Sequence, residues 1–112
     1  MSPTFQTGKD FEFLITPGDI KIKPEDFDNL MTPDSIPWTK VFKNEWTYYQ
    51  VGVDEFSYSW EMPGIQMTFN AEITFEKARQ IVEEVANKLI KYTGKEIEVL
   101  FILTDAISRF DL

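Results

Sequence analysis

Carboxylates are the side chains with which this sequence could do chemistry, because it contains neither histidine nor cysteine. Their absence removes thiol nucleophiles, disulfides, Ser-His and Cys-His relays, and zinc sites built on these residues. Asp26 and Asp28, with Asp34 downstream, superficially suggest a metal loop. The calcium-loop pattern fails, because no glycine stands at its sixth position and no glutamate at its twelfth. We therefore interpret these acids as solvated residues near the start of a helix.

No other catalytic pattern is visible in the sequence. A phosphate-binding loop needs several glycines close together, whereas the glycines here are isolated, at positions 8, 18, 52, 64 and 94. A glycosidase needs two carboxylates across a cleft, one of them with a raised pKa, and the spacing of the 19 acidic residues identifies no such pair. The sequence therefore predicts a protein that is not an enzyme and that holds no cofactor and no metal ion.

The balance of charge argues against nucleic acid and membranes as partners. The chain has 112 residues, with 19 Asp and Glu against 11 Lys and Arg, a net charge of −8. Such a field repels phosphate backbones and anionic lipid surfaces and attracts basic proteins. The longest apolar run, Val99 to Leu103, is far too short to span a membrane, and residues 1–14 lack the apolar stretch of a secretory signal. We expect a cytoplasmic protein that binds neither nucleic acid nor membranes.

The first third of the chain contains most of the prolines and predicts short elements separated by turns. β-prone residues predict a strand over residues 11–15, and a Pro-Gly-Asp sequence predicts a turn over residues 16–19. Isoleucines alternate with lysines at residues 20–23, which predicts a second, half-exposed strand. A proline followed by acidic residues predicts one or two helical turns over residues 24–31, and two further prolines predict a loop over residues 32–37.

From position 45 to position 70 the residue types and their period of two predict a β-meander. The strand expected over residues 45–53 has large side chains on both faces, with Trp46 and Tyr48 opposite Tyr49 and Val51. In the next two strands apolar residues alternate with polar ones, so each strand has one apolar face. The apolar residues of these two strands are Phe56, Tyr58 and Trp60, then Ile65, Met67 and Phe69.

A long helix and a last strand complete the predicted fold. Thr74 can cap the first turn of the helix, apolar residues recur at helical spacing after it, and Gly94 suits its end. The continuous apolar run from Val99 to Leu103 predicts a strand near the centre of the sheet, covered on both faces. Together the elements predict an α+β fold, an antiparallel β-sheet of about five to six strands packed on one long α-helix as a two-layer sandwich. We expect one domain over residues 1–112, with an irregular segment at 1–10 and a tail at 104–112.

Aromatic and acidic residues concentrate between positions 41 and 73. This segment has five acidic residues and one lysine, and it contains most of the Trp and Tyr residues. Tyr and Trp give large contact areas at low entropic cost, and neighbouring carboxylates steer a cationic partner. We therefore predict that a basic protein docks on one set of side chains: Glu45, Trp46, Tyr48, Asp54, Glu55 and Glu61. The alternative is that the aromatic residues fill the core while the acids keep the opposite face soluble.

Three consecutive stretches of the chain together resemble one known class of protein. They are a Trp- and Tyr-rich meander (WTYYQVGVDEFSYSW), a Pro-Gly turn into an alternating strand (PGIQMTFN), and a long helix with a closing strand (TFEKARQIVEEVANKLIKYTGKEIEVLFI). In texture and order, residues 41–103 resemble bacterial immunity proteins, which neutralise toxins delivered by neighbouring cells. The resemblance implies an inhibitor that occludes the basic active site of a toxin, often a nuclease, with acids that mimic phosphates. It transfers no contact residue to this chain, and residues 1–40 lie outside it.

Three classes of function fit the sequence. The first is an immunity-type binding protein, monomeric or weakly homodimeric, that neutralises a cognate bacterial toxin domain. The second is a non-inhibitory assembly or accessory protein, whose signature is a surface more apolar than acidic and a sheet edge that self-associates. The third is a small carboxylate-dependent enzyme or a carrier of a small ligand, which requires a concave pocket with convergent acids.

Overall fold

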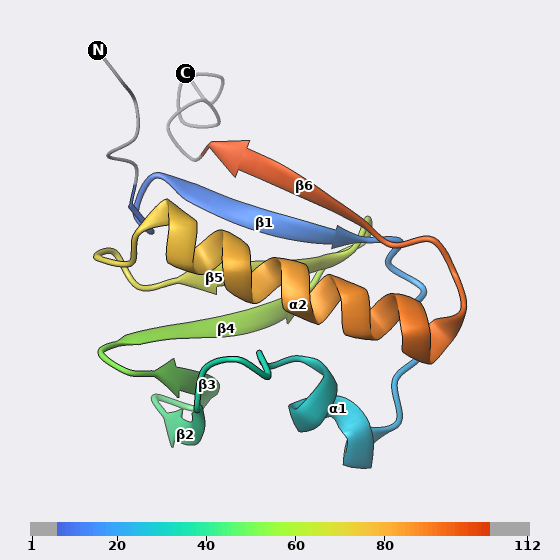
Figure 1. The fold of residues 1–112 in the computed structure, drawn as a ribbon, viewed down its shortest axis with the longest axis horizontal. Helices are drawn as coiled ribbons and strands as arrows, with labels where there is room; N and C mark the ends of the chain where they lie inside the picture. Colours follow the sequence, from blue (N-terminus) through green and yellow to red (C-terminus); the bar gives the residue numbers. More distant parts are fainter. Residues whose placement is uncertain (1–6, 104–112) are drawn as a thin grey trace.

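A six-stranded antiparallel sheet is the centre of the fold (Figure 1). The computed structural model describes residues 7–103, and the strands lie in the order β2-β3-β4-β5-β1-β6. The long helix α2 crosses one face of the sheet, with the short helix α1 in contact with it. The predicted two-layer α+β sandwich is confirmed. The elements are β1 (Phe11–Thr16), α1 (Pro24–Leu30), β2 (Thr39–Lys43), β3 (Trp46–Val51), β4 (Asp54–Trp60), β5 (Ile65–Phe69), α2 (Phe75–Thr93) and β6 (Glu98–Leu103).

The face of the sheet that α2 covers forms the hydrophobic core. Alternate residues of β1, β4 and β5 point toward the helix, and the helix turns one apolar stripe toward them, as their spacing predicts. Burying each of these side chains contributes about 1.5–3 kcal/mol. The largest fully buried side chains of this layer are Phe11, Ile15, Phe56, Ile65, Met67, Ile81, Val82, Val85 and Leu89.

Helix α2 begins and ends at the residues that the sequence predicts. The Thr74 Oγ1 accepts a hydrogen bond from the backbone N–H of Lys77 at 3.2 Å, which satisfies one of the free donors of the first turn. Gly94 adopts a left-handed conformation with φ of 71°, and its N–H donates to the carbonyl of Ile90 at 2.8 Å. Both caps are local, so the sequence alone locates this helix.

Strands β2, β3 and β4 are joined by two tight turns. Lys43 pairs with Trp46, which leaves Asn44 and Glu45 as the turn residues, and both have positive φ, 54° and 64°. Positive φ at both turn positions matches the right-handed twist of the flanking strands. The strand that the sequence predicts over residues 45–53 is thus confirmed over Trp46–Val51 as β3. Strand β2 was not predicted, because the prolines before it indicate a loop.

The proline-rich segment between β1 and β2 packs on the same side of the sheet as α2. Met31 is fully buried, and its carbonyl accepts a hydrogen bond from the hydroxyl of Tyr58 on β4 at 2.8 Å. The ring of Trp38 lies 5.9 Å from that of Tyr49, in an edge-to-face arrangement. This segment therefore completes the layer that α2 begins. We call the opposite side of the sheet the open face.

The predicted strand at residues 20–23 is wrong. Residues 17–23 form no strand, and Ile20 and Ile22 pack against the core instead. Strand β1, the nearest partner along the chain, already pairs with β5 on one side and β6 on the other. A hairpin partner for β1 would therefore find no free edge, and the alternation of isoleucine with lysine reflects packing without pairing.

Strand β6 lies at an edge of the sheet, whereas its apolar run predicted a central position. It pairs with β1 over Phe11–Thr16 and has no second neighbour among residues 7–103. Leu100 and Phe101 remain 44% and 43% exposed, on opposite faces of the strand. The composition of β6 is therefore that of a buried strand, but the topology leaves it half uncovered.

The ends of the chain are described only in part. Of the expected irregular segment 1–10, residues 7–10 form a turn, with Thr7 in an isolated bridge to Thr74. The other positions of that segment and the tail expected at 104–112 lie outside the described residues. No helix within residues 7–103 is long and apolar enough to cross a membrane.

Candidate functional site

The open face carries the large side chains that the alternation of β3 leaves outside the core. Tyr49 and Val51 point into the core, so Trp46 and Tyr48 point to the other side. Trp46 is 46% exposed and Tyr48 is half-buried. Beside them, β4 and β5 turn small polar residues toward solvent, with Ser57 paired with Thr68. The open face therefore combines exposed aromatic rings with a polar, shallow surface.

Lys43 connects the β2–β3 hairpin to β4 on this face. Its ammonium group lies 4.8 Å from the centre of the Tyr48 ring and 3.0 Å from the Oε1 of Glu55. The cation over the ring and the ion pair hold the side chains of Tyr48 and Glu55 near each other. A depression of about 140 Å³ lies between them, lined also by Ser57 and Thr68. This volume is below the roughly 300 Å³ of small-molecule sites, so the surface suits a protein better than a substrate.

Two further carboxylates of the predicted set, those of Glu45 and Glu61, are exposed to solvent, where a partner can reach them. Glu45 is in the β2–β3 turn, and Glu61 follows the end of β4, where it accepts a hydrogen bond from the hydroxyl of Ser59 at 2.8 Å. Neither forms an ion pair with any residue between positions 7 and 103. Because both carboxylates are exposed to solvent, they can attract a cationic partner without first breaking an ion pair within residues 7–103.

Asp54 is the member of the predicted set that the structure places elsewhere. It lies on the helix side of β4, is 8% exposed, and forms an ion pair with Lys77 of α2 at 2.7 Å. One residue along the strand, Glu55 points to the open face, because successive side chains alternate. We define the acidic-aromatic surface as the remaining five residues: Glu45, Trp46, Tyr48, Glu55 and Glu61.

The acids that superficially suggested a metal loop do not converge. Asp26 accepts a hydrogen bond from the hydroxyl of Tyr92 at 2.9 Å. Asp28 accepts a hydrogen bond from the hydroxyl of Tyr49 at 2.6 Å and forms an ion pair with Lys40 at 3.0 Å. Within residues 7–103 no three acidic side chains are grouped so that they could hold a metal ion. Their interpretation as solvated acids is incomplete, because Asp26 and Asp28 each tether α1 to another element.

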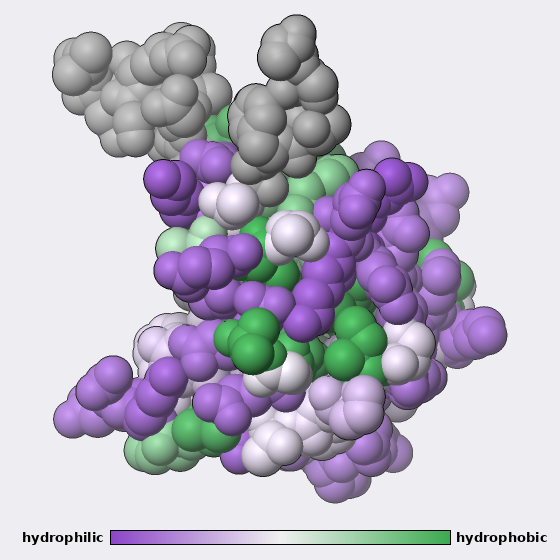
Figure 2. Space-filling view, turned by 60° about the vertical axis from the view of Figure 1, so that its left-hand side comes forward, coloured by the Kyte–Doolittle hydropathy of each residue, from purple (hydrophilic) through white to green (hydrophobic). Residues whose placement is uncertain are grey.

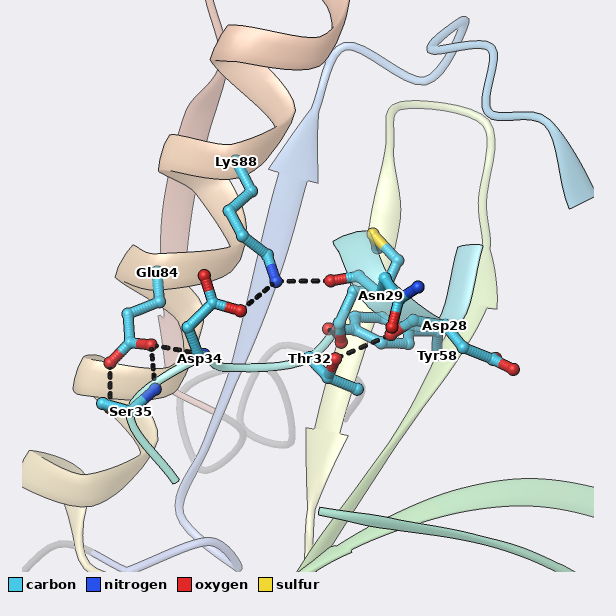
Figure 3. A network of polar contacts seen from close by, with 9 residues as sticks. Asp28, Asn29, Thr32, Asp34, Ser35, Tyr58, Glu84 and Lys88 are labelled. Atoms are coloured by element: carbon cyan, nitrogen blue, oxygen red, sulfur yellow. Dashed lines mark hydrogen bonds and ion pairs between the residues drawn. The ribbon is translucent and has the colours of Figure 1, made fainter. Parts of the chain in front are cut away.

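A polar network between α2 and the loop after α1 was not predicted from the sequence (Figure 3). The Oε1 of Glu84 accepts hydrogen bonds from the backbone N–H groups of Asp34 and Ser35, at 2.8 and 3.0 Å, and its Oε2 accepts one from the Ser35 hydroxyl. Lys88, one turn later, donates to Asp34 Oδ1 at 2.9 Å and to the carbonyl of Asn29. Glu84 and Lys88 thus hold the proline-rich loop on the helix. The contacts join residues about 50 positions apart, which no local pattern shows.

We expect the free energy of unfolding to decrease less steeply with falling pH in Glu84→Gln than in the unchanged chain. Burial raises the pKa of Glu84, but the hydrogen bonds from Ser35, Asp34 and Gln80 outweigh it and hold the pKa below its ordinary value of 4.5. A carboxyl with a depressed folded pKa adds stability above its unfolded pKa and loses it as the pH falls through the folded value. Urea unfolding between about pH 6 and pH 3 measures this dependence.

Glu83→Gln is the matched control for this prediction. Glu83 lies on the solvent side of the same helix, in an exposed ion pair with Arg79. Its replacement should change the unfolding free energy little at any pH. Equal pH profiles for Glu84→Gln and the unchanged chain would show that folding does not lower the pKa of Glu84.

Comparison of the chain with family models, with curated proteins and with solved structures gives no match. The function is therefore inferred from the residues and their geometry.

Proposed function

We propose that this protein is a binding protein that captures a basic protein on its acidic-aromatic surface. More specifically, we propose an immunity-type protein that neutralises a cognate bacterial toxin by occluding the toxin's basic surface. A nuclease is one such toxin. The observation that carries the proposal is the exposure of Trp46 on the open face, beside Tyr48 and hydrated carboxylates.

Trp46 has the position expected of an anchor rather than of a core residue. Trp46 is 46% exposed and lies on the side of β3 opposite the buried Tyr49 and Val51. Leaving this apolar area in water forgoes stabilisation on the order of 1 kcal/mol. Trp and Tyr are enriched among the residues that dominate binding energy at protein interfaces, where a partner removes the same area from water.

Electrostatics sets the class of partner. The net charge of −8, together with Glu45 and Glu61, which form no ion pair within residues 7–103, attracts a basic surface and speeds its encounter. On the side of the molecule that Figure 2 shows, hydrophilic residues predominate on the surface. The acidic-aromatic surface itself combines Trp46 and Tyr48 with the carboxylates of Glu45, Glu55 and Glu61, and a polar rim around a few aromatic anchors is the usual arrangement of an interface between proteins that also exist apart.

The neighbouring gene provides the test. We expect a gene immediately upstream to encode a large secreted protein with a toxic C-terminal domain. Coexpression of the present chain with that domain should restore growth, and titration calorimetry should show a direct complex. Continued toxicity, with no complex between the two purified proteins, would contradict the proposal.

Reversing the two unpaired charges should slow capture of the partner. We expect Glu45→Lys with Glu61→Lys to lower the association rate constant about tenfold at low salt, with little effect at high salt, because screening shortens the reach of these charges. Stopped-flow association at several ionic strengths measures both effects. The matched control is Glu76→Lys with Glu83→Lys, which makes the same charge change on exposed positions of α2. Equal effects of the two double variants would show that net charge, and not this surface, governs capture.

A non-inhibitory assembly protein is the second candidate. The exposed, apolar edge strand β6 favours it, because a self-associating edge is the signature expected of that class.

A further inference from the structure

The two edges of the sheet differ in how they are protected. Edge strand β2 carries Lys40 and Lys43, and charged residues, lysine above all, discourage another strand from pairing with an edge. Edge strand β6 carries no charge from Val99 to Leu103. Of the two edges of the described sheet, β6 is therefore the one that a second strand could join over Val99–Leu103 without burying a charge.

Strand β6 has the composition of a strand with neighbours on both sides. Leu100, Phe101 and Leu103 are 44%, 43% and 37% exposed, and they are distributed over both faces of the strand. Such double-sided apolar runs are typical of strands inside a sheet. Within residues 7–103 the outer edge of β6 has no strand partner, so it combines backbone groups open to pairing with apolar side chains above and below them.

The edge is held in place by the core. The ring of Phe101 lies 5.2 Å from that of Phe75 on α2, and 5.9 and 5.8 Å from those of Phe11 and Phe13 on β1. Cross-strand pairing with β1 extends over the whole of Glu98–Leu103. Because the strand is already ordered, pairing at its free edge costs little further conformational entropy.

We propose that β6 pairs with β6 of a second copy of this chain, antiparallel and about a two-fold axis at Phe101, so that the two sheets become continuous. Directly opposed residues of antiparallel strands lie on the same face. The register therefore sets Val99 against Leu103, Leu100 against Ile102, and Phe101 against its own counterpart. All five uncharged residues then pair with one another.

A second copy fits this edge better than a basic partner does. The edge itself has no charge to attract a cation, and a two-fold interface needs a self-complementary surface, which the uniform apolar run provides. The one charged residue of β6, Glu98, does not meet its counterpart in this dimer. In the stated register the two Glu98 residues are separated by six residue steps, about 20 Å, which is roughly twice the Debye length at physiological salt.

Analytical ultracentrifugation of the full chain tests the proposal. We expect a concentration-dependent dimer, weakened at least tenfold by Leu100→Lys, because that variant sets a charge in the paired edge. The matched control is Phe42→Lys, which makes the same kind of change at an exposed position of the other edge strand, and should leave the dimer unchanged. A monomer up to about 500 µM, or a dimer that Leu100→Lys does not weaken, would overturn the proposal.

Disulfide cross-linking tests the register, since the natural chain has no cysteine. Opposed residues have Cα atoms about 4.5–5.5 Å apart, within disulfide range, so Phe101→Cys should form a covalent dimer under mild oxidation. Leu100→Cys should not, because its counterpart is a diagonal neighbour about 8 Å away. Melting temperatures check that both variants are folded. The reverse result, with Leu100→Cys cross-linked and Phe101→Cys free, would refute the stated pairing. The inference is independent of basic-partner capture, because β6 contributes no residue to the acidic-aromatic surface.

Discussion

Replacement of Asp54 by alanine should lower the free energy of unfolding by about 3 kcal/mol. Asp54 is 8% exposed and accepts from Lys77 Nζ at 2.7 Å and from the Asn70 side-chain N–H at 2.9 Å. Without it, both donors lose their shorter contact: Asn70 keeps the long one to Glu72 Oε1 at 3.4 Å, and Lys77 keeps the carbonyl of Val51 at 2.9 Å. Removing one partner of a buried pair costs about 3–5 kcal/mol. We take the lower end of this range, because Lys77 retains some contact with water.

Urea unfolding of Asp54→Ala and Glu55→Ala measures this effect with an internal control. The two acids are adjacent, and each forms one ion pair, but Glu55 and Lys43 lie at the surface. Exposed pairs contribute about 0–1 kcal/mol, so Glu55→Ala should change stability little. A double variant, Asp54→Leu with Lys77→Met, should recover much of the loss, because it removes both charges. A loss below about 1 kcal/mol for Asp54→Ala would show that water replaces the contacts of Asp54.

Replacement of Trp46 by alanine should separate binding from stability. If Trp46 anchors the partner, its loss should weaken the complex about thirtyfold or more, the equivalent of at least 2 kcal/mol. The unfolding free energy should fall by no more than about 1 kcal/mol, because Trp46 is already 46% exposed. Titration calorimetry with the partner and urea unfolding of the free protein give the two numbers.

Phe56→Ala is the control that shows the effect of losing a core residue. Phe56 is fully buried on the helix side of β4 and stacks on Tyr49 with ring centroids 5.5 Å apart. Its loss should cost about 3–5 kcal/mol of stability. If Trp46→Ala destabilises the fold as much as Phe56→Ala does, or leaves binding unchanged, then Trp46 is a packing residue and the acidic-aromatic surface loses its anchor.

Local patterns predicted most of the elements. The period of two in β4 and β5, the apolar stripe of α2, and the caps at Thr74 and Gly94 each depend on residues that are neighbours along the chain. Alternation also sets Trp46 and Tyr48 on the face opposite Tyr49 and Val51, although which of the two faces meets the core is decided by the packing of α2 on the sheet. These predictions held because the local preference and the tertiary environment agree.

Other predictions failed where one local pattern is compatible with two environments. Ile20 and Ile22 alternate with lysine as a strand would, but both edges of β1 are occupied. The run from Val99 to Leu103 is apolar enough for the centre of a sheet, yet it lies at the edge. In both cases the number of neighbouring strands decides the outcome, and that number is a property of the whole sheet.

The sequence by itself determined most of the elements, the acidic charge, and the residue types of the acidic-aromatic surface, because these depend on local spacing and composition. The tertiary structure decided which of the acids share a surface. It paired Asp54 with Lys77 across the core and left Glu45 and Glu61 in solvent. It also set β6 at an open edge. Both decisions come from contacts between residues far apart in the chain, whose partners are chosen only when the sheet and helix pack together.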